Sequence, residues 1–361
     1  MSSNWGNHIK LSIFGESHGP AIGMVLDGLP AGEPIDMEQL RAFMDRRRPG
    51  KNRMSTPRSE TDEPHILSGI YRNHTTGTPL AIEIYNRDTH SSDYAQMDHV
   101  ARPGHADYAG HLRYCGAQDP RGGGHFSGRL TAPLTAAGGI ALQILARRGV
   151  SVGAHIASIG PLEDQLFDPV SLSAAILAKP GQKAFPVLDD SAGESMQQLI
   201  ETCRASQDSV GGVVECGITG FPPGIGSPMF DGLENRFASL LFGIPAVKGL
   251  EFGAGFDAAR HFGSQMNDPF TIQNSTVQTK TNHHGGILGG ISSGMPILFR
   301  VAFKPTPSIS RQQETVDFQK MESVVLSIRG RHDPCIVPRA VPCVEAAAAL
   351  ALLDAWMEKT K

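Results

Sequence analysis

Glycine and proline are frequent in this chain and spread along its whole length, with 41 glycines and 25 prolines among 361 residues. Both residues interrupt regular structure, because glycine accepts positive φ and proline cannot donate a backbone hydrogen bond. They are not gathered into a linker, and the chain shows no low-complexity segment or fixed-period repeat. We therefore expect many short strands and tight turns within a single domain spanning residues 1–361.

Hydrophobic periodicity predicts where the regular elements lie. Apolar and alternating runs indicate strands at residues 8–14, 23–27, 80–85, 212–218 and 297–303. Helical spacing indicates helices at residues 36–45, 134–147, 194–204 and 344–357. Because strands come in runs without strict alternation with helices, the expected fold class is α+β rather than a doubly wound sheet.

Composition and charge exclude several classes of protein. No apolar run approaches the roughly 18 residues that span a bilayer, and residues 1–6 show neither a basic leader nor an apolar region, so we expect a soluble, cytoplasmic protein without membrane contact. The net charge of −4 provides no general attraction for nucleic acid. The five cysteines are widely separated and form no Cys-x-x-Cys pair, which favours reduced, mostly buried thiols over disulfides or a metal site.

Residues 15–20 read Gly-Glu-Ser-His-Gly-Pro and follow an expected strand. Glycine lets a ligand approach the backbone closely, so Glu16, Ser17 and His18 are presented at the strand end rather than buried in a ladder. An ordinary strand-to-strand turn is the alternative for this segment alone.

A second segment of interest carries five positive charges between residues 46 and 53, beside a Pro-Gly turn. The simplest interpretation is a solvated basic turn after a helix C-terminus. Nucleic-acid binding is a weaker alternative, because the run lacks interleaved aromatic residues and the chain is acidic overall.

Three stretches together resemble one known family. Residues 15–30 combine the Gly-Glu-Ser-His-Gly run with an apolar strand and Asp-Gly-Leu-Pro, residues 102–107 read Arg-Pro-Gly-His-Ala-Asp, and residues 331–335 read Arg-His-Asp-Pro-Cys. With these motifs the chain resembles the chorismate synthases over nearly its full length. The resemblance implies a β-α-β sandwich of antiparallel sheets around a helical layer, assembled as a homotetramer.

The resemblance also implies an activity. In that family, phosphate is lost from 5-enolpyruvylshikimate-3-phosphate by a 1,4-anti elimination that gives chorismate, the last common step of the shikimate pathway towards the aromatic amino acids. The reaction makes the family carbon–oxygen lyases acting on phosphates, requires reduced FMN without net oxidation, and is associated with NADP. The chain lacks the insertions of members that reduce their own flavin, so an external reductant is expected. The alternative is a flavin-binding relative that has lost the elimination.

Residue roles follow from the matching motifs. His18 would protonate the departing phosphate, His105 would stabilise the reduced flavin, and Asp333 would relay the proton from carbon 6, with Ser17 as a further catalytic residue. The substrate carries about four negative charges, which suits guanidinium groups. The predicted substrate-binding residues are Arg48, Arg53, Arg102, Ser127, Arg129 and Arg331. The predicted flavin-binding residues are His125, Phe126, Ser127, Pro245, Ala246, Gly289, Lys304, Pro305, Thr306, Pro307, Ser308 and Arg331.

One motif departs from the family pattern. The family reads Gly-Gly-Gly-Arg-Ser-Ser-Ala-Arg-Glu-Thr where residues 122–131 here read Gly-Gly-Gly-His-Phe-Ser-Gly-Arg-Leu-Thr. The changes remove a permanent charge, a hydroxyl and a carboxylate from a loop that touches flavin and substrate. We expect Phe126 to cover the cofactor and His125 to stand in for the missing arginine.

Overall fold

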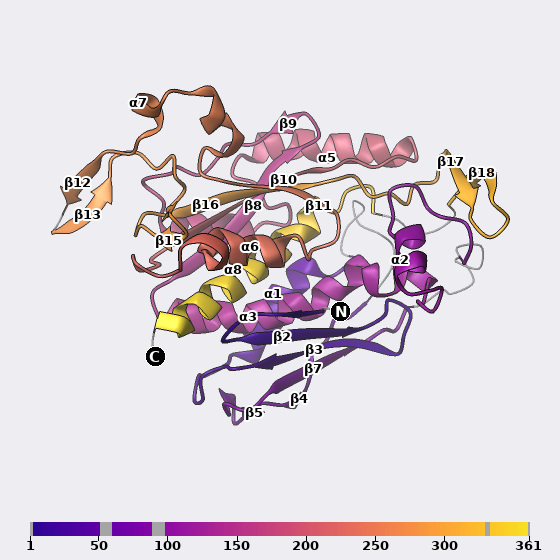
Figure 1. The fold of residues 1–361 in the computed structure, drawn as a ribbon, viewed down its shortest axis with the longest axis horizontal. Helices are drawn as coiled ribbons and strands as arrows, with labels where there is room; N and C mark the ends of the chain where they lie inside the picture. The colour runs from indigo at the N-terminus through magenta and orange to yellow at the C-terminus, as the bar shows by residue number, and fades with distance from the viewer. Residues whose placement is uncertain (1–2, 51–59, 89–97, 274, 329–332, 360–361) are drawn as a thin grey trace.

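A layer of helices lies between two antiparallel five-stranded sheets in the computed structural model, which describes residues 3–50, 60–88, 98–273, 275–328 and 333–359 (Figure 1). The first sheet has the order β1 (Asn4–Trp5), β2 (Lys10–Gly15), β3 (Ala21–Asp27), β7 (Leu80–Tyr85), β4 (His65–Ser68). The second has the order β11 (Val247–Phe252), β16 (Ile297–Phe303), β10 (Gly212–Thr219), β8 (Ser151–Ile159), β9 (Leu162–Glu163). The predicted α+β class and β-α-β sandwich are confirmed.

The first sheet buries one face. In β7, Leu80, Ile82 and Ile84 are fully buried, whereas the intervening Ala81 and Glu83 are partly exposed. This alternation places the apolar side chains against the helical layer.

The second sheet is covered on both faces. β8 and β10 each contain five consecutive buried residues, so the alternation seen in β7 is absent from their centres. Helix α8 (Val337–Lys359) packs on one face, and α4 (Ala174–Gly181) and α5 (Asp190–Ala205) lie against the other (Figure 1).

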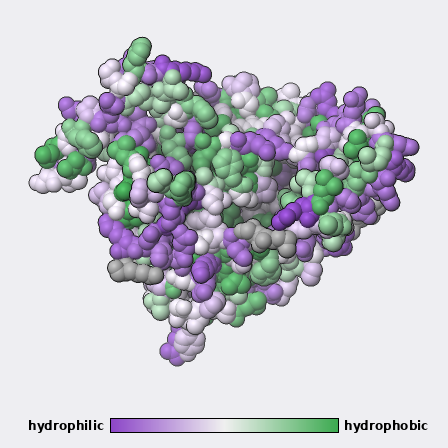
Figure 2. Space-filling view, in the orientation of Figure 1, coloured by the Kyte–Doolittle hydropathy of each residue, from purple (hydrophilic) through white to green (hydrophobic). Residues whose placement is uncertain are grey.

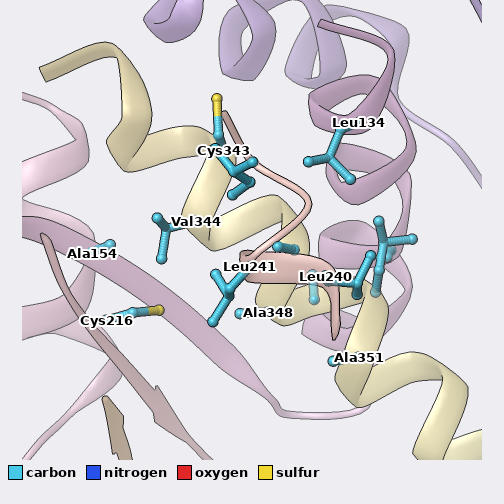
Figure 3. Close-up of a cluster of buried hydrophobic side chains, with 14 of the residues drawn as sticks. Leu134, Ala154, Cys216, Leu240, Leu241, Cys343, Val344, Ala348 and Ala351 are labelled. Atoms are coloured by element: carbon cyan, nitrogen blue, oxygen red, sulfur yellow. The ribbon is translucent and has the colours of Figure 1, made fainter. Parts of the chain in front are cut away.

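The helical layer is built on a close contact between α3 (Thr131–Arg147) and α8. A Cβ atom on Gly138 of α3 would lie 2.3 Å from the Cα of Ala346 in α8, so the two helices touch backbone to backbone. Helix α1 (Met37–Arg47) flanks α3, and α6 (Leu233–Leu241) covers α8. Figure 3 shows the resulting core, where Leu134 of α3, Leu241 of α6 and Val344 of α8 converge.

Helix α8 corrects one expectation from the sequence. By length and composition it is apolar enough to cross a membrane, although no run of that kind was expected. Its Glu345 and Asp354 interrupt the apolar run in the sequence, but both are buried and paired with Arg46 and Arg236. Because 89% of its most apolar window is buried inside the protein, α8 is a core helix.

The element predictions were correct in position and less accurate at the ends. β7 and β16 have the predicted bounds, whereas α3 and α8 begin three and seven residues earlier than the predicted starts at 134 and 344. Pro133 lies in the first turn of α3, where no backbone donor is needed. All five cysteines are free thiols as expected, with Cys216, Cys335 and Cys343 buried.

The remaining regular elements are short. They are four hairpins and two helices: β5 (Ile70–Tyr71) with β6 (His74–Thr75), β12 (Phe270–Gln273) with β13 (Thr276–Thr279), β14 (Ile287–Leu288) with β15 (Ile291–Ser292), β17 (Gln312–Asp317) with β18 (Glu322–Ser327), α2 (Asp107–Arg113) and α7 (Gly263–Met266).

We expect Gly138→Ala to lower the free energy of unfolding by about 1–3 kcal/mol, because the added methyl forces α3 and α8 apart. Gly263→Ala is the matched control, since nothing lies within 4 Å of a Cβ there, and it should change stability by less than about 1 kcal/mol. Urea unfolding of both variants measures the difference. Equal stabilities would show that the helices separate without cost.

Candidate active site

A cavity of about 710 Å³ opens at the edge of the helical layer, where α3 and α8 begin. Fourteen predicted site residues line it: Ser17, Arg102, His105, His125, Phe126, Ser127, Arg129, Pro245, Ala246, Lys304, Thr306, Pro307, Ser308 and Asp333. Segments far apart in the sequence therefore converge on one space, as the motifs predicted.

Four other predicted residues do not line this cavity. Arg48 is partly exposed and pairs with Asp45, while its neighbours Arg47 and Pro49 reach the cavity wall. Gly289 lies in the β14–β15 hairpin. His18 and Pro305 are likewise absent from the lining. Their predicted roles, which no contact in this chain tests, stay predictions. Arg53 and Arg331 lie outside the described residues.

A turn of three glycines brings the two predicted catalytic histidines together. Gly122, Gly123 and Gly124 all have positive φ, between 52° and 85°. A Cβ on Gly122 would lie 2.5 Å from Cδ2 of His18, and one on Gly123 would lie 3.1 Å from Nε2 of His105. Glycine is therefore required for two reasons: the backbone has positive φ, and a side chain would collide with the imidazoles that pack against the turn. His18 lies directly behind the cavity wall, against Gly122.

His105 is held by a buried carboxylate that the sequence analysis did not single out. The Nδ1 atom of His105 lies 2.6 Å from Oδ1 of Asp107. The same carboxylate accepts hydrogen bonds from Nη2 and Nε of Arg102, both at 2.7 Å. Burial raises the pKa of Asp107, but the hydrogen bonds from Arg102 and His105 outweigh it and hold this pKa well below its usual value. Asp107 is therefore ionised at neutral pH.

Two arginines of the wall share another buried carboxylate. Asp62 accepts a hydrogen bond from Nη1 of Arg47 at 2.5 Å and one from Arg129. Burial raises the pKa of Asp62, and the charges of Arg47 and Arg129 lower it further than burial raises it. Arg47 also donates to Thr131 Oγ1 at 3.0 Å. The middle arginine of the basic run is thus fixed in the cavity wall, and neither it nor Asp62 was predicted.

The cavity lining also carries two ammonium groups, those of Lys304 and Lys248. Lys304 donates to the carbonyl of Gly104, and its pKa is lowered by burial and by the charge of Lys248, which also lines the cavity. The hydroxyl of Thr306 is buried without a hydrogen-bond partner among the described residues. Nearby, Arg102 Nη1 lies 3.5 Å from Ser308 Oγ. An anion with several acceptor oxygens suits this group of donors.

The divergent loop is tied to the protein by its histidine. His125 Nδ1 lies 2.8 Å from the carbonyl oxygen of Gly15, and Nε2 lies 2.7 Å from Oγ of Ser3. Both nitrogens therefore have partners within the chain, which favours a structural role over replacement of the family arginine. Phe126 lines the cavity and packs beside Tyr114, with ring centroids 6.1 Å apart. Flavin contact by either residue stays a prediction.

The cavity is strongly cationic. Its described lining residues include six basic side chains and one carboxylate, Asp333, and Asp62 and Asp107 behind the wall offset part of this positive charge. The positive ends of the α3 and α8 dipoles add to this field, because both helices begin here. Asp333 itself accepts a hydrogen bond from Arg339 Nη1 at 2.7 Å. The site can therefore bind a polyanion and place imidazole and carboxylate groups beside it.

Of the site residues missed from the sequence, one had a usable signal. Asp107 stands two residues after His105 within a matched motif, so its proximity could have been expected. Lys248 follows the predicted flavin residues Pro245 and Ala246 by two positions and was not singled out. Asp62 and Arg339 lie outside the quoted motifs, and the tertiary fold brings them to the site.

Comparison with known proteins agrees with this geometry. A family model described as chorismate synthase matches residues 9–357. The chorismate synthase of Thermococcus kodakarensis is 47% identical over 349 residues, covering 97% of this chain and 96% of that protein. The chorismate synthase of Lancefieldella parvula is 45% identical over 365 residues, covering 98% and 96%. A crystal structure of a chorismate synthase superposes with a TM-score of 0.77 at 28% identity, covering 98% of this chain and 93% of that chain. The chain therefore belongs to the chorismate synthase family.

Proposed function

We propose that this lyase-family protein eliminates phosphate from 5-enolpyruvylshikimate-3-phosphate in a 1,4-anti sense, giving chorismate, with reduced FMN as cofactor. The observation that carries the proposal is the cationic cavity with two histidines packed on the glycine turn beside it. A substrate with about four negative charges suits a lining in which six basic side chains outnumber the carboxylates Asp62, Asp107 and Asp333 that pair with them. Family membership supports a role in aromatic amino acid biosynthesis.

The residues present fit FMN. Lys304 and Lys248 offer positive charge, and Asp333 is the one carboxylate among the described lining residues. Thr306, whose buried hydroxyl has no partner among the described residues, lies between Lys304 and Ser308 in the sequence. These groups would hold a phosphate and a polyol chain. When bound, reduced FMN supplies electron density that stabilises charge developing on the substrate ring.

The protein residues then bind the substrate and move its protons. Arg129 and Arg102 are held by buried carboxylates, so they present fixed donors to carboxylate or phosphate oxygens. His18 protonates the departing phosphate, and Asp333 accepts the proton from carbon 6 while Arg339 holds its carboxylate in place. His105 stabilises negative charge next to the glycine turn. Arg48, Arg53 and Arg331 retain their predicted part in anion binding.

Several wider properties belong to the same proposal. We propose a cytoplasmic, single-domain protein that assembles as a homotetramer, receives flavin from an external, NADP-linked reductant, and has no nucleic-acid or membrane partner. Self-association is supported by the arm formed by α7 and the β12–β13 hairpin, which projects at the left of Figure 1 and carries apolar residues in Figure 2. Phe262, Phe270 and Ile272 of this arm are 78%, 68% and 76% exposed. Exposed apolar patches of this kind mark protein interfaces.

We expect anaerobic incubation with 5-enolpyruvylshikimate-3-phosphate to release phosphate and chorismate only when reduced FMN is supplied, with the flavin still reduced afterwards. Absorbance of the flavin and of chorismate measures both quantities. Flavin binding without turnover would instead support a relative that has lost the elimination, and one flavin oxidised per product would exclude the proposed chemistry.

We expect His18→Ala and His105→Ala each to lower kcat by about 10- to 1,000-fold, because each residue supplies proton transfer or charge stabilisation. Circular dichroism should show an unchanged fold. His261→Ala is the control, since the side chain of His261 is exposed and contacts Asp257 at the surface. Rates near wild type in either variant would leave that histidine with a packing role alone.

We expect the affinity for FMN to fall as pH rises towards the ordinary lysine pKa of 10.5. The pKa of Lys304 lies below that value, so Lys304 loses its proton, and with it the positive charge that attracts the phosphate, at a lower pH than an ordinary lysine. Lys248→Met removes the neighbouring charge, so the fall should move to higher pH. Lys304→Met should weaken binding about tenfold or more at pH 7, whereas Lys183→Met, on a surface ion pair with Asp190, should leave it unchanged. Quenching of FMN fluorescence measures the profiles; identical wild-type and Lys248→Met profiles would contradict this assignment.

A further inference from the structure

Asp107 contacts both Arg102 and His105, so its carboxylate does more than neutralise one arginine. Its Oδ2 accepts from the backbone N–H of Arg102 at 2.9 Å and from Nε of Arg102 at 2.7 Å. Its Oδ1 accepts from Nη2 of Arg102 at 2.7 Å and faces Nδ1 of His105 at 2.6 Å. Asp107 is 8% exposed, so these contacts are shielded from water.

This geometry selects one tautomer of His105. Nη2 of Arg102 also lies 3.1 Å from Nδ1 of His105 and donates one of its two N–H groups to Asp107, but the shorter contact of Nδ1, at 2.6 Å, is with the carboxylate. A lone pair on Nδ1 would face an ionised oxygen at 2.6 Å and be repelled, so Nδ1 must carry the proton. In the neutral ring, Nε2 is then the unprotonated nitrogen.

The free nitrogen lies on the catalytic side of the ring. Nε2 of His105 faces Gly123, where an added Cβ would lie 3.1 Å away, and the adjacent Gly122 supports His18. Lys304 binds the carbonyl of Gly104, which immediately precedes His105, and so holds the backbone on the other side. Rotation of the His105 ring would therefore break its contact with Asp107 and its packing against Gly123.

We propose that Asp107 is a positioning residue, which holds His105 in the Nδ1–H tautomer, directs Nε2 to the glycine turn beside the cavity, and aligns Arg102 at the same time. The proposal rests on the proposed function for its kinetic consequence, but its tautomer prediction concerns the free protein. Arg102, His105 and Asp107 form one unit, in which the carboxylate affects the reaction by orienting the other two side chains.

The tautomer is measured directly by NMR of protein labelled with ¹⁵N in its histidine rings, at a pH where the imidazoles are neutral. His105→Gln identifies the His105 signals by their disappearance. We expect Nδ1–H in the wild type. In Asp107→Asn we expect Nε2–H. The two hydrogen bonds that Arg102 donates to Oδ2 should keep the amide oxygen at that position. The amide NH₂ then takes the place of Oδ1 and donates to Nδ1, which must be unprotonated to accept.

Steady-state kinetics with reduced FMN give the second readout. Asp107→Asn should lower kcat by about 100-fold or more, because His105 then carries its proton on the wrong nitrogen, and should raise KM by a smaller factor, because Arg102 loses the bond from its Nη2. Asp107→Glu keeps the charge and should recover activity to within about tenfold of wild type. Asp257→Asn is the matched control: it breaks a His–Asp contact of 3.0 Å on the surface, at His261, and should leave kcat unchanged.

The outcomes separate this proposal from the proposed function. Absence of turnover in the wild type would reject the function, while the NMR result would still decide the role of Asp107. An Nε2–H tautomer in the wild type overturns the proposal, as does loss of kcat in Asp107→Asn with the tautomer unchanged. If Asp107→Asn does not fold, the His105 tautomer is measured in the wild type and in Asp107→Glu, and we expect Nδ1–H in both; Nε2–H in either would overturn the proposal.

Discussion

The backbone contact between α3 and α8 sets the dimensions of the whole molecule. Because Gly138 has no side chain, α3 approaches Ala346 of α8 closely enough for the two helices to form one thin layer. Each helix packs against its own sheet on the other side. The same pairing aligns the starts of both helices, so their unpaired N–H groups and positive dipole ends meet at the cavity. The core contact and the electrostatic field of the site therefore have one origin.

Buried ion pairs fix the charged groups that this layer brings together. Removing two charges from water is expensive, and a buried pair returns that cost only with good geometry. Asp62 and Asp107 meet this condition by binding arginines of the cavity wall through several hydrogen bonds. Glu345 does the same for Arg46 and also accepts from the backbone N–H of Ala154. Such pairs add little net stability, but they hold guanidinium groups in place before an anion arrives.

The fold class and most central elements were predictable from sequence because local patterns determine them. The apolar alternation of residues 80–85 and the glycine-flanked motifs at 15–20 and 102–107 are readable without the structure. The predicted residues that line the cavity come from the motifs at 15–20 and 102–107, from the Lys-Pro-Thr-Pro-Ser run at 304–308, and from the segments around residues 122–131, 245–246 and 333.

What the sequence left open depends on contacts between distant segments. Arg47, rather than the predicted Arg48, reaches the cavity wall because the end of α1 turns it towards Asp62, and no local pattern encodes that rotation. The bonds of His125 to Ser3 and Gly15 likewise join segments that only the fold brings together. The predicted starts of α3 and α8 came from helical spacing of apolar residues, and that spacing does not show the first turns, which begin at residues 131 and 337.

The position of α8 in the chain has a consequence for biosynthesis. This helix follows every strand of both sheets, yet it supplies one half of the layer on which they close. While the ribosome is still making it, the inner face of the second sheet has no partner, and an apolar surface remains open to solvent and to other chains. The two sheets can complete their packing only after residues 337–359 have emerged. The order of the elements therefore leaves this apolar face exposed until late in synthesis, independently of how stable the finished protein is.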